Sequence, residues 1–85
     1  MKHGWVRVNI PLVLQNLADW RVRIANIEGL PEVTIKAPLG NYPVIVEADK
    51  SLLNIRIKAR IQIPIVMEQE QLIDIHIPSP YYFHL

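Results

Sequence analysis

Side chains that could do acid–base or metal chemistry are few in this sequence and lie far apart. His76 and Asp74 are two residues apart on a predicted strand, so both point to one face, which His84 could approach. Such a group could hold a metal ion, but a His–Asp pair on a solvated strand face is usually an ordinary surface pair. Ser51 and Ser79 lack the strand–turn–helix setting of a hydrolase nucleophile. We therefore expect no catalytic residue, no metal site, no cofactor and no enzymatic activity.

The cysteine and glycine content excludes further kinds of site. The 85 residues include no cysteine, which rules out disulfide frameworks, thiol nucleophiles and thiolate metal ligands. The three glycines, Gly4, Gly29 and Gly40, are isolated, so none belongs to a glycine-rich phosphate-binding loop.

The composition is that of one small folded domain. Hydrophobic residues make up 51% and charged residues 20% of the chain, which is too apolar for a disordered protein. The longest proline-free apolar run is three residues, far below the roughly 18 that a membrane span needs. Residues 1–5 hold no apolar signal-peptide core. We expect synthesis in the cytoplasm and no membrane partner, and leave open deposition on a spore or cell surface.

The elements that position these side chains are predicted to be strands. Thirteen Ile and eight Val residues dominate the apolar set, and such β-branched side chains pack well on a pleated sheet. Seven prolines and three glycines interrupt the chain at short intervals, as turns do in all-β domains. We predict a single small antiparallel β-sandwich of six to seven strands, or a partly open barrel, over residues 1–77. An extended Pro- and aromatic-rich tail follows over residues 78–85.

The clearest strand covers residues 53–66, where apolar and polar residues alternate with a period of two. We predict that it forms a hairpin with residues 71–77, joined through residues 68–70. In this register the inward apolar residues of the two strands would lie opposite each other, and Pro64 would mark an edge or a bulge. The predicted cross-strand pairs are Ile65 with Ile73, Ile63 with Ile75, and Ile61 with Ile77.

The remaining strands are predicted from shorter patterns. Residues 5–10, 20–27 and 33–37 are predicted to be strands. Residues 44–48 are predicted to be a strand that is central or covered on both faces, because both faces are largely apolar. Residues 11–19 could continue the first strand or form a short helix that Pro11 opens, and both alternatives stay open.

Basic residues at alternate positions define a basic face on the long strand, formed by Arg56, Lys58 and Arg60. Such cations prevent uncontrolled strand pairing, or could contact the phosphates of a nucleic acid. The strand carries no aromatic residues for base stacking, so nucleic acid is an alternative partner that the sequence does not favour. Most acids are expected in turns, and this separation of charge could also let copies of the chain stack. The acids expected in turns are Asp19, Glu28, Glu32, Asp49, Glu68 and Glu70.

A tetrapeptide of branched apolar residue, polar residue, Ile and Pro occurs at residues 8–11, 61–64 and 75–78. It is typical of a strand end, but could also anchor an extended segment on a neighbour's edge strand. The tail ends in aromatic residues that would form a sticky patch in water, so we expect it to dock on its own sandwich or on a second copy. The predicted self-association residues are Ile61, Ile63, Pro64, Ile75, Ile77, Pro78, Tyr81, Tyr82 and Phe83.

Residues 8–15, VNIPLVLQ, followed by residues 30–36, LPEVTIK, resemble segments of β-rich spore-coat-associated domains of spore-forming bacteria. The resemblance covers about a third of the chain and implies a surface-layer or assembly role, with no catalytic residues to carry over.

These observations favour a non-enzymatic structural subunit that assembles with copies of itself into a filament, coat or shell. Edge strands and the aromatic tail would make the contacts. One alternative is a small nucleic-acid-binding barrel that uses the basic face. Another is a carbohydrate-binding module, since Trp5 lies on the outward parity of its strand.

Overall fold

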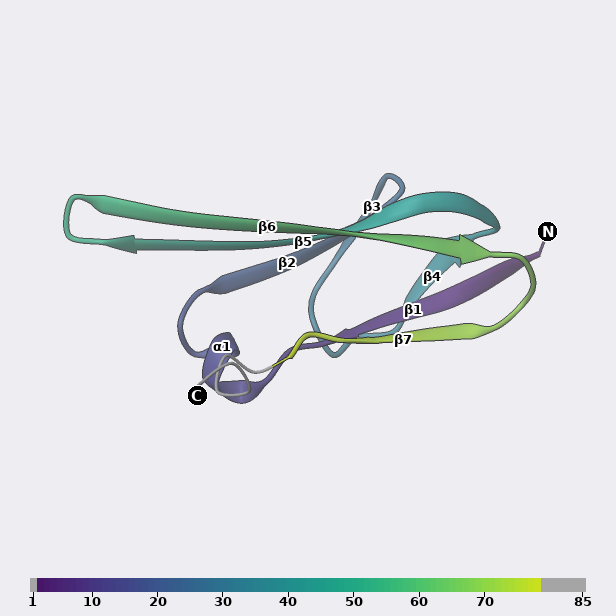
Figure 1. The fold of residues 1–85 in the computed structure, drawn as a ribbon, viewed down its shortest axis with the longest axis horizontal. Helices are drawn as coiled ribbons and strands as arrows, with labels where there is room; N and C mark the ends of the chain where they lie inside the picture. The colour runs from purple at the N-terminus through teal and green to yellow at the C-terminus, as the bar shows by residue number, and fades with distance from the viewer. Residues whose placement is uncertain (1, 79–85) are drawn as a thin grey trace.

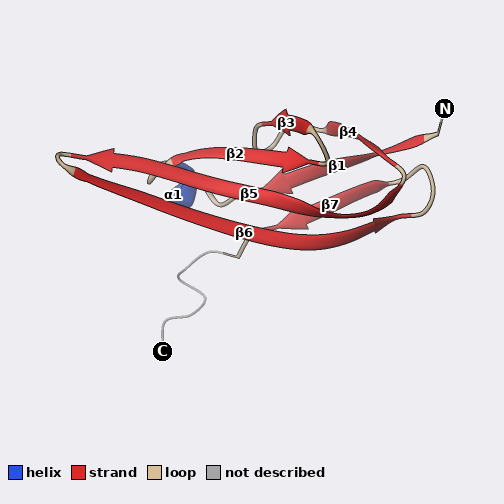
Figure 2. Cartoon of the chain, turned by 90° about the horizontal axis from the view of Figure 1, so that it is seen from above, coloured by secondary structure: helices blue, strands red, loops and turns tan. Residues whose placement is uncertain are grey.

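The fold is described by a computed structural model that covers residues 2–78, apart from the side chains of Leu52 and Ile57. Within this range, seven strands form two facing sheets and one short helix follows β1, so the predicted all-β sandwich is confirmed. One sheet has the order β4-β1-β7 and the other β3-β2-β5-β6 (Figures 1 and 2). The elements are β1 (His3–Asn9), α1 (Leu12–Gln15), β2 (Asp19–Ile24), β3 (Ile27–Gly29), β4 (Ile35–Pro38), β5 (Gly40–Leu52), β6 (Ile55–Met67) and β7 (Leu72–His76).

The core lies between the two sheets and is made by the alternation of the strands. Val6 and Val8 on β1 face Val22 on β2 and Val44 and Val46 on β5, and all five are fully buried. Each burial removes a branched side chain from water and contributes about 1.5–3 kcal/mol. The predicted inward parity of the first strand and the central position of residues 44–48 are therefore both confirmed.

The longest feature is the β5–β6 hairpin, in which both strands have 13 residues. Its register runs from Gly40↔Met67 to Leu52↔Ile55. On its other side, β5 pairs with β2 only as far as Asp49, because its partner Asp19 is the first residue of β2. Residues 50–57 thus extend beyond β2 as a two-stranded projection, which we call the arm (Figure 1).

The predicted pairing of residues 53–66 with residues 71–77 is wrong. β6 pairs with β5, whereas β7 crosses to the other sheet and pairs in parallel with β1, with Val6 opposite Ile73. The connection at residues 68–71 spans the roughly 10 Å between packed sheets instead of making a hairpin. Both arrangements direct Ile73 and Ile75 to the core, so the alternation of the sequence could not distinguish them.

Pro64 lies on an edge strand, as predicted, although its partner is Pro43 and not Asp74. Neither proline has an N–H, so the two can only face each other where the strands exchange no hydrogen bond. The Pro43 nitrogen points to the side of β5 where β2 has already ended. The Pro64 nitrogen points away from β5, along the free edge of β6.

Local turn chemistry accounts for the other differences from the sequence-based strands. Residues 20–27 are not one strand, because a turn at Ala25–Asn26, with Ala25 at φ 53°, begins the short strand β3. Residues 11–19 contain one helical turn, α1, which begins after Pro11. Trp20 fixes this turn, since its indole Nε1 donates a hydrogen bond of 2.7 Å to the Leu14 carbonyl.

Candidate binding surfaces

Two edge strands, β6 and β7, lie on the same side of the sandwich, one in each sheet (Figure 2). We call this side the open side. The inward side chains there are not sealed from water: Ile61 is 39% exposed, and Ile63 and Ile75 are half-buried. On the opposite side, the segment that links β3 to β4 crosses between the sheets, and Ile35 behind it is buried. The core is therefore less covered along the open side.

The predicted self-association residues meet at the open side in a different geometry from the one expected. Ile61 and Ile63 on β6 lie in one sheet, and Ile75 on β7 lies in the facing sheet. Ile77 follows β7 and packs half-buried against the same core. Pro64 is exposed on β6 and Pro78 is exposed beyond β7. Tyr81, Tyr82 and Phe83 lie outside the described residues.

The free backbone groups of both edges can be deduced from the hydrogen-bonding pattern. Because the Pro43–Pro64 pair exchanges no bond, alternate β6 residues direct their N–H and C=O groups outward. These are Arg56, Lys58, Arg60, Gln62 and Val66, interrupted by Pro64.

On β7, the Trp5 N–H donates to the Gln71 carbonyl at 2.9 Å, and the Ile77 N–H donates to the Asn9 carbonyl at 2.9 Å. The odd residues of β7 therefore face β1, and Leu72, Asp74 and His76 point outward. Both strands of the open side can accept a further strand.

The basic face lies next to acidic side chains of the neighbouring strand. Arg56, Lys58 and Arg60 lie on β6 directly opposite Ser51, Asp49 and Glu47 of β5, so acids and bases share one surface. The expected separation of charge is thus wrong, because three acids predicted in turns belong to strands. These are Asp19 on β2, Glu28 on β3 and Asp49 on β5. Opposite charges on neighbouring strands favour one register, which explains their mixing on an exposed hairpin.

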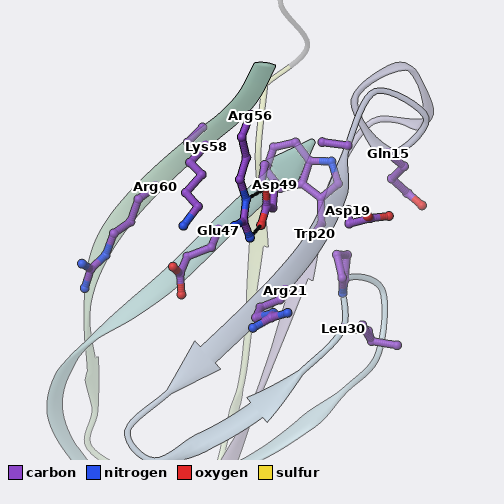
Figure 3. A pocket seen from close by; sticks show the side chains of 14 residues that line it. Gln15, Asp19, Trp20, Arg21, Leu30, Glu47, Asp49, Arg56, Lys58 and Arg60 are labelled. Carbon is purple, nitrogen blue, oxygen red and sulfur yellow. Dashed lines mark hydrogen bonds and ion pairs between the residues drawn. The ribbon is translucent and has the colours of Figure 1, made fainter. Parts of the chain in front are cut away.

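Arg56 and Asp49 form the best-defined ion pair of the hairpin. The Arg56 Nη2–Asp49 Oδ2 distance is 2.6 Å and the Nε–Oδ1 distance is 3.1 Å, a bidentate geometry (Figure 3). This hydrogen bonding holds the pKa of the Asp49 carboxyl below its usual value. Among the described residues, Lys58 and Arg60 form no ion pair.

An open groove of about 1020 Å³ runs along this charged surface towards α1 and the segment after β3. Its polar lining includes Arg21, Glu47 and Asp49 as well as the basic face (Figure 3). Such alternating charges suit a surface that is itself mixed in charge. They are less suited to a phosphate backbone, which favours uninterrupted cations.

The outer face of the β4-β1-β7 sheet carries a second polar cluster around Asp74. Arg7 Nη2 lies 2.8 Å from Asp74 Oδ2, and Arg7 Nε lies 3.3 Å from Oδ1. The Asn9 amide also donates to Asp74 Oδ1, and His76 Nε2 is 3.9 Å from Oδ2. Hydrogen bonding to Arg7 is the main cause that lowers the pKa of the Asp74 carboxyl.

Trp5 stands beside this cluster, 36% exposed, with its ring in edge contact with His3 at 4.9 Å between centroids. The sequence identified the Asp74–His76 pair but missed Arg7 and Asn9. Their signal was the alternation of β1, which places both residues on the same outward parity as Trp5.

Two findings limit the chemistry of the described part of the chain. Residues 2–78 hold no group of three or more His, Asp or Glu side chains that could bind a metal ion, and His84 lies outside them. Within the same range, no helix is long and apolar enough to cross a membrane.

Comparison with protein-family models, with curated proteins and with solved structures finds no match to this chain. The similarity of residues 8–15 and 30–36 to spore-coat-associated domains therefore stays a prediction.

Proposed function

We propose that this protein is a non-enzymatic structural subunit that associates with copies of itself through the open side. The observation that carries the proposal is the coincidence of two unpaired edge strands with half-exposed isoleucines between them. Unpaired N–H and C=O groups accept another strand, and the isoleucines gain free energy when a second molecule covers them. The predicted aromatic tail would add contacts of its own to the assembly.

The lengths of the edge strands also support this choice. β3 and β4 have three and four residues, which gives little backbone for pairing, whereas β6 has 13. A long edge strand is a template for association unless something blunts it. Pro64 and the cations at positions 56, 58 and 60 partly do so, because two β6 strands overlapping there would place like charges opposite each other. Such features favour one defined contact over indiscriminate aggregation.

The first experiment measures molar mass by light scattering over a range of concentrations, with electron microscopy of the same samples. The wild type should form dimers or larger assemblies. Gln62→Pro removes an outward N–H of β6 without touching the bonds to β5, so it should weaken association. Glu28→Pro is the matched control, because it changes an outward position of β3 on the opposite side. A wild type that stays monomeric at high concentration would refute the proposal.

The contribution of the tail is tested separately by deleting residues 80–85. The truncated protein should keep the circular dichroism spectrum of the wild type and associate less. Unchanged association would remove the tail from the contact and leave the open side as the whole interface.

A second candidate function is carbohydrate binding on the outer face of the β4-β1-β7 sheet. Its support is the exposed Trp5 ring beside the hydrogen-bonded Arg7–Asp74–Asn9 cluster, since sugars stack on aromatic rings and bond to fixed polar groups. A glycan that binds there should quench tryptophan fluorescence in the wild type and in Trp20→Phe, but not in Trp5→Phe. Lack of quenching across a panel of glycans would exclude it.

A further inference from the structure

Leu53, at the tip of the arm, is unusual both in its backbone conformation and in its exposure to water. Leu53 is 96% exposed, and its φ of 56° lies in the left-handed region. The two-residue turn Leu53–Asn54 closes the Leu52↔Ile55 pair, and a positive φ at its first position favours glycine. A leucine there is costly both for the backbone and for the surface.

The apolar character of the tip continues into the strand that follows. Ile55 is 64% exposed and is the first residue of β6. Among the described residues the arm has no neighbour beside β5, because β2 begins only at Asp19, and no layer opposite it, because β1 and β7 belong to the body of the sandwich (Figures 1 and 2). A site where local rules fail without a structural gain is a candidate for binding.

Cations surround this apolar tip. Residues 50–67 contain four basic side chains, at Lys50, Arg56, Lys58 and Arg60, and no acidic one. On the paired strand, Asp49 is bound to Arg56 and Glu47 lies opposite Arg60, so over residues 47–60 the four cations exceed the two acids by two. The tip is thus an apolar point within a basic collar, a combination that fits a surface with negative charge outside and hydrocarbon beneath.

The arm also has the reach that such a contact needs. Three residue pairs and a turn lie beyond the last row shared with β2. At about 3.3 Å per residue this places the tip roughly 10 Å beyond the end of β2, a distance comparable with the depth of the interfacial region of a bilayer.

We propose that the arm docks on an anionic lipid bilayer, with Leu53 and Ile55 inserted at the interface, and with Lys50 in the arm and Lys58 and Arg60 next to it against the headgroup phosphates. The sequence excluded a membrane partner because no run could span a bilayer, but interfacial insertion needs only a few apolar side chains. The inserted residues lie in the arm, beyond the half-exposed isoleucines of the open side, so Leu53 variants separate lipid docking from self-association although Lys58 and Arg60 belong to β6.

A pocket on a second copy is a poorer acceptor for the same tip. The apolar hollow of the described residues is lined by Ile27, Ala37 and Pro38. It is flanked by Lys2 and Lys36, which would repel the basic collar of the arm. A lipid surface with negative headgroups has the opposite, favourable charge.

The test is co-sedimentation with vesicles of phosphatidylcholine, with and without phosphatidylserine. The wild type should bind the anionic vesicles and not the neutral ones. Leu53→Gly removes the inserted side chain while suiting the positive φ, and should weaken binding by about tenfold. Asn54→Gly is the matched control, since it alters the same turn but leaves the apolar tip, and should bind as the wild type does. Lys58→Gln and Arg60→Gln should each weaken binding by about fivefold.

Three outcomes would overturn the proposal. One is absence of wild-type binding to anionic vesicles. Another is equal binding of wild type and Leu53→Gly, which would mean simple charge attraction without insertion. The third is a Leu53→Gly variant that loses self-association and keeps vesicle binding, because the tip would then dock on protein. Unfolding cannot imitate the expected result, since thermal melting of Leu53→Gly is measured alongside and should be no lower than that of the wild type.

Discussion

The β5–β6 hairpin has two halves with one sequence pattern and two different environments. Alternating isoleucines run along the same face of β6, but Ile65 is 8% exposed in the body and Ile55 is 64% exposed in the arm, with Ile61 between them at 39%. The difference is the presence of an opposing layer, which β1 and β7 provide in the body only. Periodicity therefore determines which face a side chain occupies, whereas burial depends on what the rest of the chain places against that face.

The charged face of the same hairpin shows a related contrast. In the body, packing against β2 and the core fixes the register of β5. In and next to the arm, the register is fixed by the backbone hydrogen bonds between β5 and β6 and by the cross-strand ion pair between Arg56 and Asp49. Exposed ion pairs stabilise little, so the arm should be the first part of the hairpin to open.

The largest expected effect contrasts isoleucine truncation in the two halves. Ile65→Ala leaves a cavity in the packed body and should lower the free energy of unfolding by about 2–4 kcal/mol. Ile55→Ala removes an exposed side chain of the same strand and should change it by less than about 0.5 kcal/mol. Urea denaturation of both variants measures the difference. Similar losses at both sites would mean that the arm is covered in solution.

The packing of the body, away from the arm, is tested at Gly4, where β1 passes the connection between β6 and β7. A Cβ at this position would overlap Met67 Sδ and lie 2.8 Å from the Gln71 carbonyl oxygen. The methionine side chain can move, but the backbone oxygen can do so only by shifting β7. Gly4→Ala should therefore cost about 1–3 kcal/mol in the same urea experiment. A neutral result would show that β7 is loosely held against β1.

In the arm, removing a side chain should raise the free energy of unfolding instead of lowering it. Leu53→Gly relieves the positive φ and exposes less apolar surface, at the cost of some chain entropy in the unfolded state. The net gain in stability should be roughly 0.5 kcal/mol, seen as a slightly higher melting temperature. A clear loss of stability would mean that Leu53 packs against the protein.

The two halves also explain what the sequence could and could not predict. Alternation identified the β class, the inward residues of β1 and the central position of β5, because these depend on local pattern. It could not assign the partner of β7, since Ile73 and Ile75 face the core in either arrangement. Ile61, Ile63, Ile75 and Ile77 were predicted as neighbours in one sheet, whereas the structure places them in the two facing sheets. Their part in self-association stays a prediction.

The arm was missed for the same reason. Its signal was a strand of perfect alternation longer than a small sandwich can cover, together with a leucine where a hairpin turn favours glycine. Neither feature shows where the opposing layer ends, because that depends on the lengths of β1, β2 and β7 together.

The smallest effects concern the two bidentate ion pairs, one in each region. The pKa of Asp49 is lowered by Arg56, and that of Asp74 by Arg7 and Asn9. A carboxyl whose pKa is lower in the folded state adds stability above its unfolded value, and loses it as the pH falls through the folded value. Both groups should therefore titrate by NMR below the ordinary Asp value of 3.8.

Salt should distinguish the two pairs. Asp74 is held by two hydrogen-bonding side chains and Asp49 by one, so high salt should restore the pKa of Asp49 further towards its ordinary value. Asn9→Ala is the deciding variant, since it leaves Arg7 as the single hydrogen-bonding side chain on Asp74, as Arg56 is on Asp49. The two carboxyls should then respond alike to salt. If Asp74 keeps its resistance without Asn9, the rigidity of the packed sheet beneath the pair, and not the number of donors, separates the body from the arm.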